Sequence, residues 1–182
     1  MKCTALELAG LRLIEPRVFP DPRGFFLAPW NDAQFRADVA DATFVQDNHS
    51  RSSRGTLRGL HYQLEHTQGK LVRCPLGRVW DVVVDVRRSS PTFGRSVGME
   101  LSDDNHRQLW IPPGFAHGFL VLSDIADVQY KVTDIYHPTS ERSLLWNDRS
   151  LDISWPIDPS MTLTLSPKDM VGTPLSGIEP LP

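Results

Sequence analysis

The chain has 182 residues, of which 40% are hydrophobic and 23% are charged, and its formal net charge is −3. This composition is typical of a soluble globule, and we expect one domain over residues 1–182. No run of about 18 apolar residues exists, so no membrane span is expected. The acidic balance argues against nucleic-acid binding, which requires a basic surface. The start of the chain lacks an apolar signal core, and Cys3 and Cys74 have no metal-ligand spacing, so we expect a cytoplasmic protein.

The predicted elements are short and mostly β. A helix is predicted over residues 31–40, where Asn31 can serve as the N-cap. Short segments rich in Val, Leu and Trp follow it between turn signals, and they are predicted to be strands at residues 44–48, 71–87, 96–102, 107–114, 116–123, 127–136 and 143–148. Many short strands with regular punctuation are typical of a sandwich or barrel. The tail after about residue 165 is predicted to wrap the surface.

Residues 79–86 alternate in the manner of a strand. Trp80 and the valines at 82, 84 and 86 share one face, whereas Asp81 and Asp85 share the other. An unpaired carboxylate is costly to bury. We therefore expect the face with the two acids to be exposed to solvent.

Two segments carry histidines in the spacing of the cupin double-stranded β-helix, a jelly-roll barrel. The first cupin motif, G-x5-H-x-H followed by Glu, is met by Gly55 and His61, but Gln63 replaces the second histidine and the Glu is missing. The second motif, P-x-G-x2-H, is met by residues 112–117, which end in His117. A transition-metal site in this barrel requires three histidines and a carboxylate. The expectation is a mainly β, cupin-type barrel with a few short helices, no metal site and no cofactor.

The polar residues left at the mouth of this barrel form a candidate proton-transfer set. Histidine takes up protons near neutral pH, as a base at His61 would require. Lys70 can stabilise an enolate oxygen, and Tyr130 can return a proton from another strand. For each residue alone a structural role is the commoner one, such as a buried histidine bonded to a carbonyl, and only their combination favours catalysis.

Motifs from about residue 12 to residue 170 resemble the dTDP-4-dehydrorhamnose 3,5-epimerase family, whose barrel is a metal-free cupin. They occur in the order of that family: FPDPRGFF (19–26), QDNHSR (46–51), GTLRGLHYQ (55–63), QGKLVR (68–73), DVVVDVR (81–87), SPTFG (90–94), WIPPGFAHGF (110–119), YK (130–131) and WP (155–156).

The resemblance implies a role for each site residue. His61 corresponds to the base that removes the C3 and C5 protons, which the C4 ketone acidifies. Asp169 corresponds to the acid that orients this histidine, Tyr130 to the proton donor on the opposite face, and Lys70 to the cation that polarises the C4 oxygen. The residues that the resemblance assigns to substrate contacts are Arg23, Gln46, Asp47, Asn48, Arg58, His117, Tyr136, Glu141 and Lys168.

The resemblance further implies a dTDP-4-keto-6-deoxy sugar as substrate and a homodimer that exchanges its N-terminal strand, so that Arg23 would serve the site of the neighbouring subunit. One departure from the family is Ala28, where a glutamate is usual. Strict alternation would also place Arg58 and His61 on opposite faces of one strand. Both can reach one site only if the strand bulges or twists, which Gly55 and Gly59 would permit.

Two alternatives remain open from the sequence. A near relative that inverts C3 alone would use the same base and the same acid. A sugar-nucleotide-binding barrel without activity would have no need of His61, Asp169 and Tyr130 together. We expect inversion at both carbons.

Overall fold

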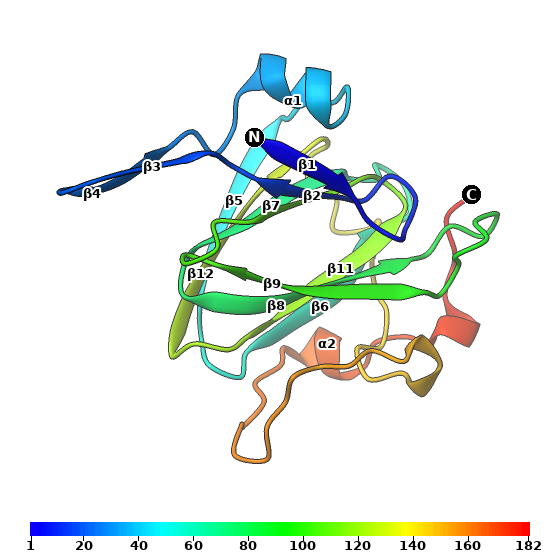
Figure 1. Cartoon of the computed structure of the whole chain (residues 1–182). Coiled ribbons are helices and arrows are strands. Elements are labelled where there is room, and N and C mark those ends of the chain that lie inside the picture. Colours follow the sequence, from blue (N-terminus) through cyan, green and yellow to red (C-terminus); the bar gives the residue numbers. More distant parts are fainter.

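Two antiparallel β-sheets face each other in the computed structural model, which describes residues 1–182 (Figure 1). One sheet has the strand order β1 (Lys2–Ala5), β2 (Arg12–Glu15), β10 (Gln108–Ile111), β7 (Lys70–Leu76), β12 (Ile125–Val132) and β5 (Gln46–Ser53). The other has the order β13 (Glu141–Ser143), β6 (Leu57–Gln63), β11 (Phe115–Val121), β8 (Arg78–Asp85) and β9 (Ser96–Ser102). A separate hairpin consists of β3 (Val18–Asp21) and β4 (Gly24–Leu27). The predicted mainly β, cupin-type fold is confirmed.

The helical elements are few and short: α1 (Asp32–Asp38), α2 (Pro167–Met170) and the 3-10 turns Arg149–Leu151 and Leu175–Gly177. Helix α1 confirms the helix predicted from the sequence, and the Asn31 side chain caps it by accepting a hydrogen bond from the Gln34 amide at 3.0 Å. Its buried residue, Phe35, packs edge-on against Trp110 of the six-stranded sheet. None of the helices has the length and apolar character needed to cross a membrane.

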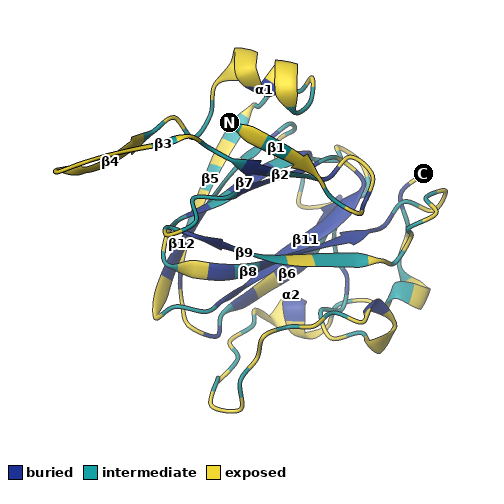
Figure 2. Cartoon of the chain, viewed as in Figure 1, coloured by how far each residue is buried: buried dark blue, intermediate teal, exposed yellow.

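Apolar side chains fill the space between the two sheets. Val72 and Leu109 from the six-stranded sheet pack there with Val83 and Phe119 from the other, and all four are at most 4% exposed. Alternation along each strand directs every second residue into this layer. Figure 2 shows β11 dark blue along its whole length, whereas the β3–β4 hairpin and much of α1 are exposed.

The C-terminal part of the chain covers the outer face of the five-stranded sheet. Leu151 and Leu181 are buried against Val82 and Val84 of β8, on the face of that strand that points away from the inter-sheet core. The predicted surface tail therefore lies on the barrel, and it contributes buried residues to a second core. As a result, both faces of β8 are buried.

The exposure expected for Asp81 and Asp85 is wrong, because both residues are 0% exposed. The partners that an inward-facing carboxylate requires are present. Asp85 accepts hydrogen bonds from Arg87 and from the hydroxyl of Thr92, at distances between 2.6 and 2.9 Å. Burial would raise the pKa of Asp85, but these bonds outweigh it and lower that pKa to about 2. Asp81 has a histidine partner in the site described below.

A bulge in β6 re-aims the side chains of that strand. Its register against β11 shifts: Arg58 lies opposite Phe119, but His61 lies opposite His117, so three steps along β6 match two along β11. Gly59 within the bulge has a φ of +116°, which L side chains rarely adopt. The bulge that the sequence required for Arg58 and His61 is confirmed.

Candidate active site

A cavity of about 610 Å³ is lined by residues from both sheets and from α2. Most of the site residues expected from the sequence line it, namely His61, Asp169, Tyr130, Lys70, Gln46, Asn48, Arg58, His117, Tyr136, Glu141 and Lys168. They come from strands β5, β6, β7, β11, β12 and β13, from the loop after β12 and from the C-terminal segment. The fold therefore gathers groups that are far apart in the sequence into one polar cavity.

His61 is paired with a buried carboxylate. Its Nε2 lies 2.6 Å from Oδ1 of Asp169, and Asp169 is 2% exposed. Burial would raise the pKa of Asp169, but hydrogen bonds from His61 and Ser166 outweigh it and lower that pKa. A charged carboxylate at Nε2 favours the tautomer with its proton there, which leaves Nδ1 with the lone pair of a base.

Ser166 is a site residue that the sequence reasoning missed. Its hydroxyl donates to Oδ2 of Asp169 at 2.7 Å, and its side chain caps α2 by accepting from the Asp169 amide. The signal was present in the sequence. Residues 166–169 read Ser-Pro-Lys-Asp, which has a serine N-cap, a proline in the first turn and an acid three residues after the cap. The carboxylate that orients His61 is thus held by a helix cap.

Tyr130 and Lys70 bring two further proton-carrying groups to the cavity. Burial raises the pKa of Tyr130, although the charges of Arg58 and Lys168 oppose that shift. Its hydroxyl therefore stays protonated at neutral pH. Burial lowers the pKa of Lys70 from 10.5 to about 8, against the charges of Asp81 and Glu141. Its ammonium group lies 3.5 Å from the His61 carbonyl oxygen.

His117 is held by the buried carboxylate that the sequence reasoning placed in solvent. Nε2 of His117 lies 2.9 Å from Oδ2 and 3.1 Å from Oδ1 of Asp81. Both residues are almost fully buried, and they lie diagonally across the adjacent strands β11 and β8, with His117 opposite Val83. Asp81 is therefore a positioning residue for His117. Strand alternation predicted which residues share a face of β8 with Asp81, but it could not show that this face points into the barrel.

Glu141 lies at the edge of the cavity, where it is the centre of a second cluster of polar and charged side chains. Glu141 accepts hydrogen bonds from Lys168 at 2.8 Å and from the Tyr136 hydroxyl at 3.1 Å. Burial would raise the pKa of Glu141, but the bond from Lys168 and the nearby charge of His61 outweigh it and lower that pKa. Tyr136 is 49% exposed, so a flat ligand could stack on its ring.

The comparisons with known proteins agree with this geometry. A model of the dTDP-4-dehydrorhamnose 3,5-epimerase family matches residues 5–176. The chain belongs to this family. It is 54% identical to the dTDP-4-dehydrorhamnose 3,5-epimerase of Pseudomonas aeruginosa over 173 residues, which cover 94% of each protein. It is 55% identical over 165 residues to the Neisseria gonorrhoeae protein of the same name, with 91% of this chain covered but only 50% of the longer relative.

A solved structure extends the agreement to the fold of this family. The epimerase from Legionella pneumophila, crystallised with dTDP-4-keto-L-rhamnose, superposes on this chain with a TM-score of 0.94. The two proteins are 48% identical, and the match covers 98% of this chain and 94% of that one.

Two residues expected at the epimerase site lie elsewhere. Asp47 occupies the face of β5 opposite to that of Gln46 and Asn48, as strand alternation requires, and its carboxylate bonds to Lys131 at 2.9 Å. Arg23 lies at the tip of the β3–β4 hairpin, where its side chain is 90% exposed and its guanidinium donates to Asp21 at 2.7 Å. Within this chain, neither Asp47 nor Arg23 lines the cavity.

Gln63 occupies the position where metal-binding cupins have a ligand histidine. Its amide is fully engaged in the epimerase barrel: Nε2 donates to the His66 carbonyl at 2.6 Å, and Oε1 accepts from the His137 amide at 2.8 Å. The residue is 5% exposed. The Gln63 side chain therefore connects two loops at the rim of the cavity through hydrogen bonds.

Proposed function

We propose that this chain converts dTDP-4-dehydro-6-deoxy-D-glucose to dTDP-4-dehydro-L-rhamnose by inverting C3 and C5 of the sugar. The observation that carries the proposal is the 2.6 Å contact between His61 and buried Asp169, in a cavity that also receives Tyr130 and Lys70. Inversion of a carbon requires proton removal on one face and proton delivery on the other. The cavity offers a base and an acid from different strands for these two steps.

The reaction follows from the C4 ketone. Nδ1 of His61 takes the proton from the carbon next to the ketone, and the electron pair moves to the C4 oxygen as an enolate. The ammonium group of Lys70 stabilises that oxygen, and Asp169 stabilises the imidazolium. The hydroxyl of Tyr130 then delivers a proton to the opposite face of the same carbon. Solvent returns a proton to the tyrosinate and accepts one from His61, and the cycle repeats at the second carbon.

The rest of the cavity suits a nucleoside diphosphate. Arg58 and Lys168 supply positive charge for the diphosphate, since guanidinium and ammonium groups both bind phosphate oxygens. The exposed ring of Tyr136 is available for the thymine base. His117, held by Asp81, faces the sugar. These assignments are supported by the common cavity and by the family resemblance of the residues.

The proposal includes a homodimer of single-domain, 182-residue subunits, in which the β3–β4 hairpin of one copy reaches the cavity of the other. The hairpin projects away from the barrel (Figure 1), and its Phe25 and Phe26 are 59% and 67% exposed. Such aromatic exposure is typical of a surface that a partner covers. Arg23 at the tip would then reach the diphosphate of the neighbouring site. A cytoplasmic location is supported by the two free thiols, Cys3 and Cys74.

The function can be tested by incubating the protein with the 4-keto sugar nucleotide in deuterated water. We expect deuterium at C3 and C5, read by NMR, and product with both centres inverted. Label at C3 alone would replace the proposal with a 3-epimerase. Tight binding of dTDP without any label would replace it with a binding protein. The matched control is dTDP-glucose, which has no C4 ketone to acidify its protons and should take up no label.

A further inference from the structure

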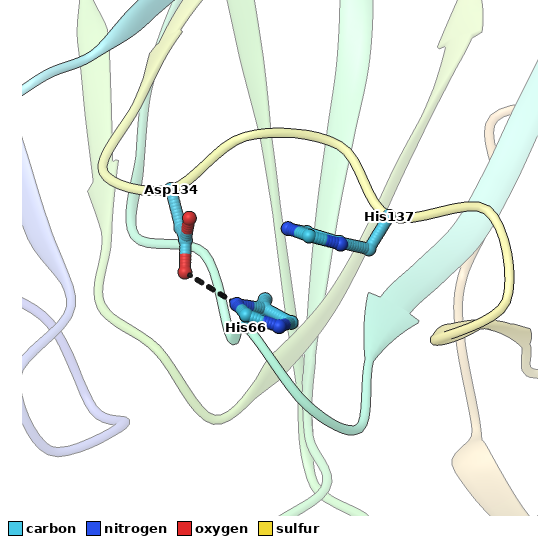
Figure 3. Close-up of side chains that lie close together, drawn as sticks. All are labelled: His66, Asp134 and His137. Carbon is cyan, nitrogen blue, oxygen red and sulfur yellow. Dashed lines mark hydrogen bonds and ion pairs between the residues drawn. The ribbon is translucent and has the colours of Figure 1, made fainter.

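Three potential metal ligands converge outside the cavity, at the rim of the barrel. They are His66 in the loop after β6, and Asp134 and His137 in the loop after β12. One ligand atom from each residue lies within 4.8 Å of the ligand atoms of the other two. Figure 3 shows both imidazole rings with a nitrogen turned towards the Asp134 carboxylate. None of these residues lines the cavity.

The backbone around this cluster is fixed by two glutamine side chains. The buried amide of Gln63 bonds to the His66 carbonyl and the His137 amide, so one side chain sets the spacing of the two histidines. Gln68 donates to the Asp134 carbonyl at 2.8 Å. The Asp134 carboxylate also accepts from the Ile135 amide at 2.8 Å. The three ligands are therefore carried on a preorganised frame, as a metal site requires.

The side chains themselves are close to a chelating arrangement. Nδ1 of His66 lies 3.2 Å from Oδ2 of Asp134, and the rings of His66 and His137 stack nearly parallel with centroids 3.7 Å apart, so one ring must turn for both to bind the same ion. Around a tetrahedral zinc ion, with bonds of about 2.0–2.2 Å, ligand atoms lie about 3.3–3.5 Å apart. The first pair is already close to this spacing. The widest separation, 4.8 Å at most, closes by rotation of partly exposed side chains.

We propose that His66, Asp134 and His137 form a binding site for a divalent transition-metal ion of the zinc class. Two imidazoles and a carboxylate suit zinc, nickel and copper, and do not suit magnesium or calcium, which select oxygen ligands. With three protein ligands, the ion keeps at least one water and exchanges with solution. Thr67, Gln68 and Tyr136 on the same two loops line the cavity, so the bound ion ties together two parts of its rim.

The test is a calorimetric titration of the whole protein, free of any affinity tag, with zinc sulfate alone. We expect one zinc ion per chain and a rise in melting temperature with zinc. His66→Asn removes the imidazole but keeps a residue that tolerates the left-handed φ of +55° at this position. His137→Gln removes the second imidazole. Each change should weaken binding by about tenfold or more and abolish the zinc-dependent rise in melting temperature.

Two further variants keep the test decisive. Asp134→Asn retains the oxygen that accepts from the Ile135 amide but removes the charge, so it should weaken zinc binding without the loss of the loop structure. His49→Gln is the matched control, because His49 pairs with a single carboxylate, that of Asp127 at 3.1 Å, and should leave zinc affinity unchanged. Absence of zinc binding, or equal affinity in wild type and in all three cluster variants, would overturn the proposal.

Discussion

The surroundings of individual side chains in this cavity shift their pKa values, and the resulting protonation states match the roles they are given. Asp169 is 2% exposed but remains a carboxylate, because His61 and Ser166 donate to its two oxygens. Tyr130 remains a phenol, and the lowered pKa of Lys70 makes its ammonium group a stronger acid than that of a surface lysine. These environments provide a base with its orienting acid. They also provide a proton donor and a cation that can stabilise an oxyanion.

His61→Ala should lower the rate of deuterium exchange by about 10²–10⁴-fold, because a general base commonly contributes that much. Asp169→Asn should slow the same step by less, since the imidazole remains and only its orientation and the stabilisation of its cation are lost. Exchange is measured by NMR, and dTDP affinity is measured alongside to show that the cavity is intact. Wild-type exchange in His61→Ala would remove this histidine from the mechanism.

Tyr130→Phe should separate exchange from inversion. The ring remains and only the hydroxyl is lost, so His61 still removes protons and returns deuterium to the same face. Label should therefore enter the substrate far faster than inverted product forms. Both rates come from one NMR time course. If inversion proceeds at the wild-type rate, the donor is another group or water.

Deprotonation of Lys70 should cause activity to fall at alkaline pH. Burial lowers its pKa to about 8, so the charged form that stabilises the enolate is present below that pH and is lost as the pH rises through it. Lys70→Arg keeps a positive charge to above pH 12 and should abolish the limit near pH 8, at the cost of a slower rate from altered geometry. The measurement is the exchange rate between pH 6 and 10. A limit at the same pH in Lys70→Arg would assign it to another group.

At the scale of single elements, the bulge in β6 decides which side chains reach the cavity. It lets Arg58 and His61 line the same cavity, although strict alternation would separate them. The bulge needs glycine at position 59 for two reasons: the positive φ, and a neighbouring strand so close that an added Cβ would lie 2.6 Å from Cα of Gly118. The close approach of β6 and β11 thus allows only glycine.

Gly59→Ala should destabilise the protein by at least about 1–3 kcal/mol, the usual cost of a strained backbone position, with a further cost from the contact to Gly118. Chemical denaturation measures this change. The matched control is Gly24→Ala at the hairpin tip, where φ is +134° but no atom lies within 4 Å of the added Cβ. Equal losses at the two sites would show that backbone conformation alone matters and that strand packing does not.

At the scale of the whole molecule, the isolated chain leaves Arg23 far from the chemistry that the family resemblance gives it. The hairpin that carries Arg23 makes no sheet with the barrel, and its phenylalanines are exposed. A twofold dimer would bury these residues and complete two cavities at once. The catalytic unit would then be the pair of subunits.

Co-expression of Arg23→Ala and His61→Ala chains should restore activity that neither variant has alone. In the mixed dimer, one cavity combines the intact barrel of one chain with the intact hairpin of the other, so random pairing should yield about a quarter of wild-type activity. Steady-state turnover of the co-purified mixture measures it. The matched control pairs His61→Ala with Arg58→Ala, two changes within the barrel, and should restore nothing. Turnover equal to the sum of the separate variants would place Arg23 outside the shared site.

Local sequence patterns determined the mainly β class, the capped helix that begins after Asn31, and the two faces of β8. They also identified most of the residues that line the cavity. Capping and alternation depend only on neighbours within a few positions, so they can be read from the sequence directly. The family motifs added roles to residues whose types already suggested proton transfer.

Tertiary structure alone decided which of these faces are buried and which groups meet. Asp81 and Asp85 are buried because their face of β8 points into the barrel, and alternation could not show which face that is. The opposite face, with Val82 and Val84, is covered by a tail that lies about 100 residues later in the chain. The contact of His61 with Asp169 spans 108 residues, and the cluster of His66 with Asp134 and His137 depends on two loops tied by Gln63. Such contacts follow from packing, because burial and hydrogen-bond partners are properties of the folded chain and not of any short segment.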